Sequence, residues 1–237
     1  RIIPQFHKYL KVDKSLVALC VQVSHAIVKL IRLLPEDRQG PQLRQLLGRL
    51  VATLRSREQQ VRDDTRATLQ QVVATIGPKY FGFVLKELKS QLSKGYQLQV
   101  LGFTLHALLY NLRPTMTAGD LDHCAEELAT TLIEDIVGEA GEKKQVKAIQ
   151  TAMKESRTVK SYDSIEILAE CITFKTHVRS ILFPVHGILT ATVSLSLVKQ
   201  MEELLRRTAV GLTRNVSMQP DDLLLLLYHV VSGNLAF

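Results

Sequence analysis

Aromatic residues are scarce in this chain of 237 residues, and tryptophan is absent. Aromatic side chains make up 5% of the sequence, and leucine, valine and isoleucine carry most of the apolar share. That composition suits packed helices better than a β-sandwich, because strands are enriched in aromatic residues. No stretch alternates between apolar and polar residues for long enough to indicate a strand. These two absences predict an all-α protein.

The sequence also lacks the short motifs of common catalytic and nucleotide-binding sites. It contains no GxxxxGK[ST], GxGxxG, GxSxG or HExxH. The seven histidines are scattered, and the adjacent His123 and Cys124 would point to different sides of a helix. We therefore predict no catalytic residue, no metal site and no cofactor. An enzyme whose site escapes these motifs is the remaining alternative.

Paired cysteines are missing as well. Cys20, Cys124 and Cys171 lie far apart and form no CxxC, and an odd, unpaired set is typical of a reducing compartment. Cys20 and Cys124 each fall within an apolar helical stripe, where cysteine acts as a small hydrophobic residue. We expect these two side chains to be buried.

What the chain does contain is helical periodicity, most clearly from Glu58 to Leu92. Two helices are predicted here, joined at Gly77, which can end a helix, and Pro78, which suits the first turn of the next. So short a connection makes them antiparallel neighbours. Apolar residues at a three-and-four spacing mark the inner faces: Val61, Thr65, Leu69, Val72, Val73 and Ile76 on the first, and Phe81, Leu85, Leu88 and Leu92 on the second.

Such a pair cannot bury its apolar stripes alone, so it needs neighbouring pairs to stack against. Pairs begin near residues 12, 58 and 95, roughly forty residues apart, which is the period of HEAT-type repeats. The predicted fold is an α-solenoid of antiparallel helix pairs (HEAT/armadillo-like repeats), with helix pairs in 1–137 and further HEAT-type helices in 161–237. Pro41 is expected to open one helix, and Asp120 and Ser161 to cap two others.

Residues 138–160 break this pattern. From Glu142 to Lys160 there are six lysines or arginines and two glutamates, whereas Gly119 to Gly141 holds seven acids and no base. We predict a basic, flexible inter-repeat insertion that docks on phosphate backbone or on an acidic protein face; a solvated loop without a partner is the alternative. The candidate RNA- or partner-binding residues are Lys143, Lys144, Lys147, Lys154, Arg157 and Lys160, and then Lys86, Lys89 and Lys94.

Two apolar stretches lie toward the C-terminus. Residues 180–198 carry no charge, but Pro184, Gly187 and several serines and threonines make them a poor membrane span. We expect a bent, buried helix, a break near Ala191 and the start of another helix. Residues 223–227 are apolar on all sides, so they should lie deep in the solenoid or be covered by sequence outside this chain.

Several runs of the sequence resemble one particular family. They are Ile76 to Leu109, which begins IGPKYF, the MKE at Met153, and KSYDSIEILAE from Lys160 to Glu170. They resemble the very large HEAT-repeat protein of the small-subunit processome, also called the "down-regulated in metastasis" family. The VRDDTRATL from Val61 is also similar to the VRxxAxxxL signature of HEAT repeats. Because the family protein is several times longer and this chain begins without Met, we expect a fragment.

The resemblance implies a nucleolar scaffold without catalysis, acting in early small-subunit assembly and pre-rRNA processing. The implied partners are processome proteins, pre-ribosomal RNA and a small nucleolar ribonucleoprotein, with no membrane and no small-molecule substrate. The net charge of +7 is compatible with such acidic partners. The alternative is a HEAT-type nuclear transport or signalling adaptor, which would bind peptide segments and be indifferent to ribonuclease.

Overall fold

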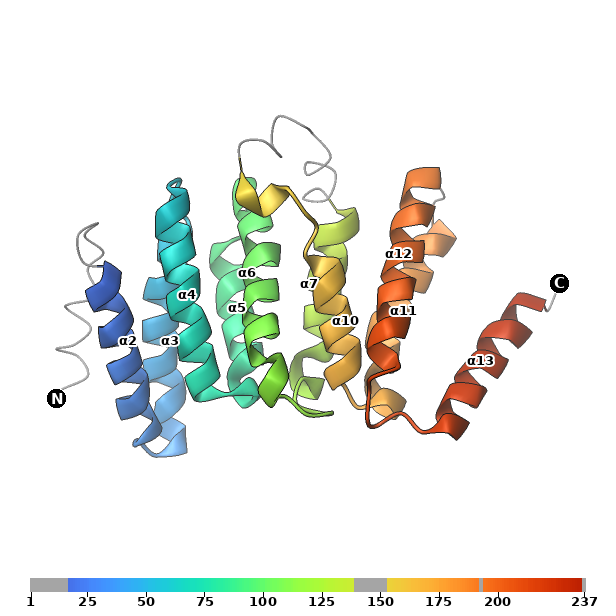
Figure 1. Ribbon diagram of the computed structural model, residues 1–237, viewed down its shortest axis with the longest axis horizontal. Helices are drawn as coiled ribbons and strands as arrows, with labels where there is room; N and C mark the ends of the chain where they lie inside the picture. Colours follow the sequence, from blue (N-terminus) through green and yellow to red (C-terminus); the bar gives the residue numbers. More distant parts are fainter. Residues whose placement is uncertain (1–16, 139–152, 192–193, 236–237) are drawn as a thin grey trace.

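The computed structural model describes residues 17–138, 153–191 and 194–235, and within these ranges it contains helices and no strand. The helices form two layers along the long axis of the molecule (Figure 1). The layer nearer the viewer consists of α2 (Val17–Arg32), α4 (Gln59–Ile76), α6 (Tyr96–Leu112), α10 (Ser161–Cys171) and α12 (Leu195–Leu212). The layer behind it consists of α3 (Glu36–Thr53), α5 (Phe81–Gln91), α7 (Ala125–Val137) and α11 (Phe174–Ala191).

Successive helices of the near layer contact one another. Each helix pair along the chain has one helix in the near layer and one in the layer behind it (Figure 1). Apolar side chains from both layers form one buried cluster. Pairs start at residues 59 and 96, close to the predicted 58 and 95, and the next starts at 161, after the insertion. The predicted all-α solenoid is therefore confirmed.

The hairpin of α4 and α5 follows its sequence pattern closely. Gly77 adopts a φ of 83°, in the left-handed region that glycine tolerates, and Pro78 begins a 3₁₀ turn that leads into α5. The predicted inner residues of α5, such as Phe81 and Leu85, are fully buried. On α4, the side chains at 65, 69, 72 and 73 are buried, while those at 61 and 76 are partly buried.

Three residues predicted to open or cap a helix do not do so. Helix α3 begins at Glu36, with acidic residues in its first turn that suit the helix dipole, and Pro41 lies inside it. Asp120 caps the turn before α7 instead of α7 itself, because its Oδ2 accepts from the backbone N–H of Thr117 at 2.7 Å. Ser161 lies inside α10, and its hydroxyl donates to Oδ2 of Asp135 at 2.7 Å.

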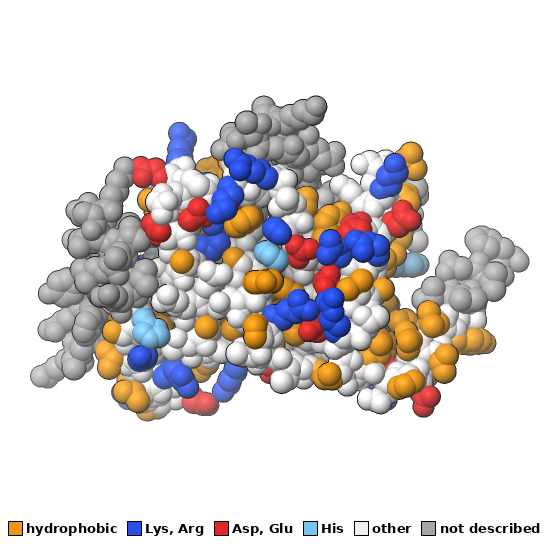
Figure 2. Space-filling view, viewed as in Figure 1, with side chains coloured by type: hydrophobic (Ala, Val, Ile, Leu, Met, Phe, Trp, Pro, Cys, Tyr) orange, Lys and Arg blue, Asp and Glu red, His pale blue; other side chains and the backbone are white. Residues whose placement is uncertain are grey.

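The C-terminal part confirms one predicted boundary and corrects two predictions of burial. Helix α11 contains Pro184 and ends at Ala191, and α12 begins at Leu195, as expected, but α11 is not the buried helix that was predicted, since Phe183 is 65% exposed. Among the described helices, none is long and apolar enough to cross a membrane. Helix α13 (Pro220–Leu235) is not deeply buried: Leu224 is 64% and Tyr228 66% exposed, and Figure 2 shows apolar side chains along it. Coverage by sequence outside this chain stays a prediction.

Two of the three cysteines are described with their side chains. Cys124 and Cys171 are buried, and burial raises the pKa of each thiol to about 12. A thiol that stays protonated is a poor nucleophile and metal ligand. The predicted burial of Cys124 is confirmed, whereas the side chain of Cys20 lies outside the described part of the chain.

Candidate binding site at the edge of the solenoid

The described end of the basic insertion crosses the near layer at one edge of the solenoid. Residues 153–160 run past the N-terminal end of α6 to the start of α10 (Figure 1). They include a 3₁₀ turn, Lys154–Ser156, which contacts α6. Ser156 is buried, and its hydroxyl hydrogen-bonds the side-chain oxygen of Gln99 on α6. We call residues 153–160 the strap.

The strap is held by one buried carboxylate. Glu155 is fully buried and meets two arginines that lie one turn apart on α4. Arg62 donates from Nε to Oε1 at 2.9 Å and from Nη2 to Oε2 at 3.0 Å. Arg66 donates from Nη2 to Oε1 at 2.9 Å. Bidentate, charge-assisted hydrogen bonds of this kind are among the strongest that side chains make.

The remaining donors of Arg62 are also engaged. Its Nη1 donates to the backbone carbonyls of Ser56 at 3.0 Å and Arg57 at 2.9 Å, and its Nη2 to Oε1 of Gln59 at 2.6 Å. The side chain is 3% exposed. A buried guanidinium is tolerated only when its donors are satisfied, and these contacts, together with Glu155, meet that condition.

Arg66 is placed in the same way. Its Nη1 lies 2.5 Å from Oδ1 of Asp63, and its Nε donates to the hydroxyl of Thr104 at 3.3 Å. Its guanidinium carbon lies 4.6 Å from the ring centroid of Phe103, a cation–π distance. Two arginines on α4 and an aromatic ring on α6 therefore form a preorganised binding site for the Glu155 carboxylate, which we call the seat of Glu155.

The arginines keep Glu155 ionised. Burial alone would raise the pKa of this carboxyl, but hydrogen bonds from Arg62 and the charges of both arginines lower it to about 2. The ordinary value is 4.5. A difference of this size corresponds to about 3 kcal/mol of stability at neutral pH.

We expect this contribution to disappear in acid. Because the pKa is depressed in the folded state, the stabilisation is complete above about pH 4.5 and is lost as the pH falls toward 2. Urea unfolding of the wild type and of Glu155→Gln, measured between pH 7 and pH 2.5, tests this. The difference in unfolding free energy should shrink as the pH falls, and a difference independent of pH would contradict it.

The structure describes three of the candidate residues from the insertion, all within the strap. Lys154 is exposed and its Nζ lies 3.3 Å from Oδ2 of Asp63. Arg157 is exposed, and Lys160 lies 3.1 Å from Oδ2 of Asp163. The other three, Lys143, Lys144 and Lys147, fall outside the described residues, so the flexibility predicted for the insertion stays a prediction.

The second candidate set lies elsewhere. Lys86 and Lys89 are on α5, in the layer away from the strap, and Lys94 follows that helix. Lys86 and Lys94 are exposed, while Nζ of Lys89 lies 3.3 Å from Oε1 of Glu127 on α7. The two predicted sets are thus not one surface, and Lys89 is matched by an acid.

Basic residues on α12 and just after it are likewise matched by acids. Arg207 and Arg214 pair with Glu166 on α10 at 3.2 and 2.5 Å. Hydrogen bonds from Arg206 and Arg207 lower the pKa of Glu203 to about 2. Figure 2 shows blue and red side chains next to each other over these helices. Lys154 and Lys160 of the strap are matched by acids as well, so the candidate nucleic-acid contact at the strap rests mainly on Arg157, which is exposed and has no ion pair among the described residues.

Sequence reasoning missed the residues that hold the strap. The sequence analysis assigned no role to Arg62 and Arg66, and charged residues usually face solvent. One signal was available: two arginines one turn apart beside an apolar stripe, and Glu155 isolated among lysines. No metal site accompanies them; in the described ranges no three histidine, cysteine or acidic side chains are grouped to hold an ion.

Comparison with known proteins gives relatives over nearly the whole chain. Residues 11–231 match the model of the U3 small nucleolar RNA-associated protein 20 domain. The chain is 35% identical to U3 small nucleolar RNA-associated protein 20 of Schizosaccharomyces pombe over 96% of its length, and 33% identical to that of Saccharomyces cerevisiae over 85%. It spans only 9% and 8% of the length of these relatives.

Proposed function

Because the chain belongs to the U3 small nucleolar RNA-associated protein 20 family, we propose that it is a scaffold segment of the small-subunit processome. In this proposal it acts in the nucleolus, without catalysis of its own, and supports pre-rRNA processing by bridging pre-ribosomal RNA and assembly factors. The names of the two relatives record association with the U3 small nucleolar RNA. The family resemblance stated from the sequence is confirmed by the same comparisons.

The observation that carries the proposal is the seat of Glu155. It holds the C-terminal end of the basic insertion against α4 and α6, so that Lys154 and Arg157 stand exposed at the edge of the rod. Lysine and arginine side chains positioned in this way neutralise phosphates without reading bases. The contact we propose is with RNA backbone, sensitive to salt and weak in sequence preference.

We expect Lys154→Glu/Arg157→Glu to weaken binding of a pre-ribosomal RNA transcript by about tenfold or more, and to lower the slope of log affinity against log salt by about 1–2. Fluorescence anisotropy at several salt concentrations measures both. A matched control is Lys29→Glu/Lys199→Glu, two exposed lysines at opposite ends of the near layer. Both variants should melt like the wild type. If they then lose RNA affinity equally, the strap is not a specific RNA contact.

The scaffold role is tested in the full-length protein. We expect the same two edge reversals to slow early small-subunit rRNA processing when the variant replaces the native protein, because the RNA contact is lost while the fold remains. Northern blots of the pre-rRNA intermediates provide the measurement. Normal processing after depletion of the protein would overturn the proposed function altogether.

A further inference from the structure

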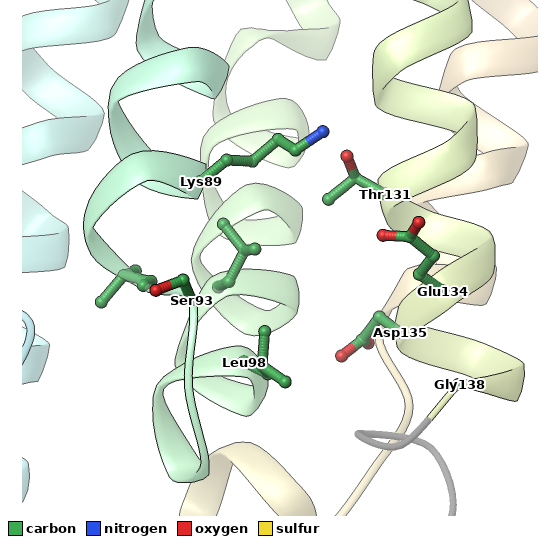
Figure 3. Close-up of a pocket in the computed structure, with 9 residues that line it drawn as sticks. Lys89, Ser93, Leu98, Thr131, Glu134, Asp135 and Gly138 are labelled. Atoms are coloured by element: carbon green, nitrogen blue, oxygen red, sulfur yellow. The ribbon is translucent and has the colours of Figure 1, made fainter.

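A pocket of about 360 Å³ opens between α5, α6 and α7. Figure 3 shows its walls: Lys89 and Ser93 come from α5 and the loop that follows it, Leu98 from the first turns of α6, and Glu134 and Asp135 from α7. It involves none of the residues that hold the strap. Its chemistry also differs from that of the basic edge.

The inner surface of the pocket is apolar. Leu92, Leu98 and Leu101 line it, with Leu92 fully buried and Leu101 only 7% exposed. Such a surface suits the methylene stem of a long side chain, which can lie along leucines while its polar end stays at the opening. The volume admits one side chain of that kind, and not a helix.

Among the described residues, acidic side chains predominate at the opening. Glu134 is exposed, and within the described part of the chain it has no ion-pair partner. Asp135, beside it, adds a second carboxylate while its Oδ2 holds Ser161. The lysine that lines the pocket, Lys89, is matched by Glu127. Of the described residues that line the pocket, two carry a carboxylate and one an amine, and that amine is already matched.

Two helix ends reinforce this charge. Helix α5 ends at Gln91 and α7 at Val137, so the C-terminal turns of both border the pocket. The C-terminal end of a helix carries a partial negative charge and favours cations. Helix α7 itself carries four acidic residues and no lysine or arginine. This field repels phosphate and attracts a cationic side chain.

We propose that the pocket binds an arginine side chain from a basic segment of a partner protein. The arginine stem lies on Leu98 and Leu101, and its guanidinium donates to the carboxylate of Glu134, with Asp135 adding attraction. Arginine fits better than lysine because its planar group can donate two parallel hydrogen bonds to one carboxylate. The solenoid then has two unlike surfaces, a basic edge for RNA and an acidic pocket for protein.

Methyl NMR of the 237-residue chain tests the proposal, with N-acetyl-arginine amide as the probe. We expect saturable shifts of the Leu98 and Leu101 methyl groups. Binding should weaken by about tenfold or more with the neutral isostere N-acetyl-citrulline amide, because a charge-assisted hydrogen bond is lost. Glu134→Gln should weaken arginine binding to a similar extent. Since Glu134 is exposed, this variant should melt like the wild type.

The matched control is Glu126→Gln, the same change at an exposed residue in the first turn of α7. It should leave the binding of the arginine probe unchanged. The proposal is overturned if no saturable shift occurs, if citrulline or a leucine amide shifts the same methyl groups as strongly, or if Glu126→Gln weakens binding as much as Glu134→Gln. A short RNA that displaces the arginine probe from these methyl groups would also overturn it.

Discussion

Replacing Glu155 with glutamine is expected to lower the free energy of unfolding by about 3–5 kcal/mol, the typical cost of breaking a buried ion pair. The variant keeps the size of the side chain but leaves Arg62 and Arg66 buried without their shared counter-charge. It also places an amide N–H₂ where an arginine donor points, so two donors would face each other. For a chain of this length the melting temperature should fall by about 10 °C, which circular dichroism can follow.

Two further variants separate the charge effect from the packing effect. Glu126→Gln makes the same chemical change at an exposed site and should alter stability by less than about 0.5 kcal/mol. The triple variant Arg62→Met/Arg66→Met/Glu155→Met removes the whole buried cluster and should recover most of the lost stability, because apolar groups of similar size often replace buried ion pairs without loss. If Glu155→Gln melts like Glu126→Gln, the strap is not held as described.

Replacing Gly211 with alanine is expected to destabilise the junction of α10 and α12 by about 2 kcal/mol or more. An added Cβ would overlap the carbonyl oxygen of Glu166 and lie 2.8 Å from the Cβ of Ala169. Helix α12 would have to move away from α10, which would loosen the pair between Arg214 and Glu166. The loss should exceed the gain of about 1 kcal/mol that alanine brings to a helix interior.

The same substitution at Gly187 is the control. This glycine lies within α11, and a Cβ added there would meet nothing within 4 Å. Gly187→Ala should therefore stabilise the chain, by up to about 1 kcal/mol. Urea unfolding of both variants gives the comparison. A Gly211→Ala variant as stable as Gly187→Ala would show that the two helices are not in close contact there.

The helix pairs were predictable from the sequence because their signals are local. The spacing of Leu69, Val72, Phe81 and Leu85 identifies the buried faces, and the glycine–proline step between them sets the turn. Helix starts were predicted less well. Asp120 and Ser161 resemble capping residues, but their side chains bond a neighbouring turn and another helix, which local pattern does not reveal.

The candidate site was only partly predictable. Lys154 and Arg157 stand exposed, as a basic cluster would. The burial of Arg62 and Arg66 depends on a carboxylate 93 and 89 residues away in the sequence, and periodicity carries no information about that pairing. The same limit applies to Lys89. Its ion-pair partner Glu127 lies on another helix, so the sequence did not show that this candidate contact residue lines an acidic pocket.

The strap has a mechanical consequence. In a stack of helix pairs each pair contacts only its neighbours, so the stack can bend at every interface between pairs. The strap fastens to α4 through Glu155, to α6 through Ser156, and continues directly into α10. It therefore braces two consecutive junctions at once, and this stretch of the rod should bend and twist less than the stretches on either side.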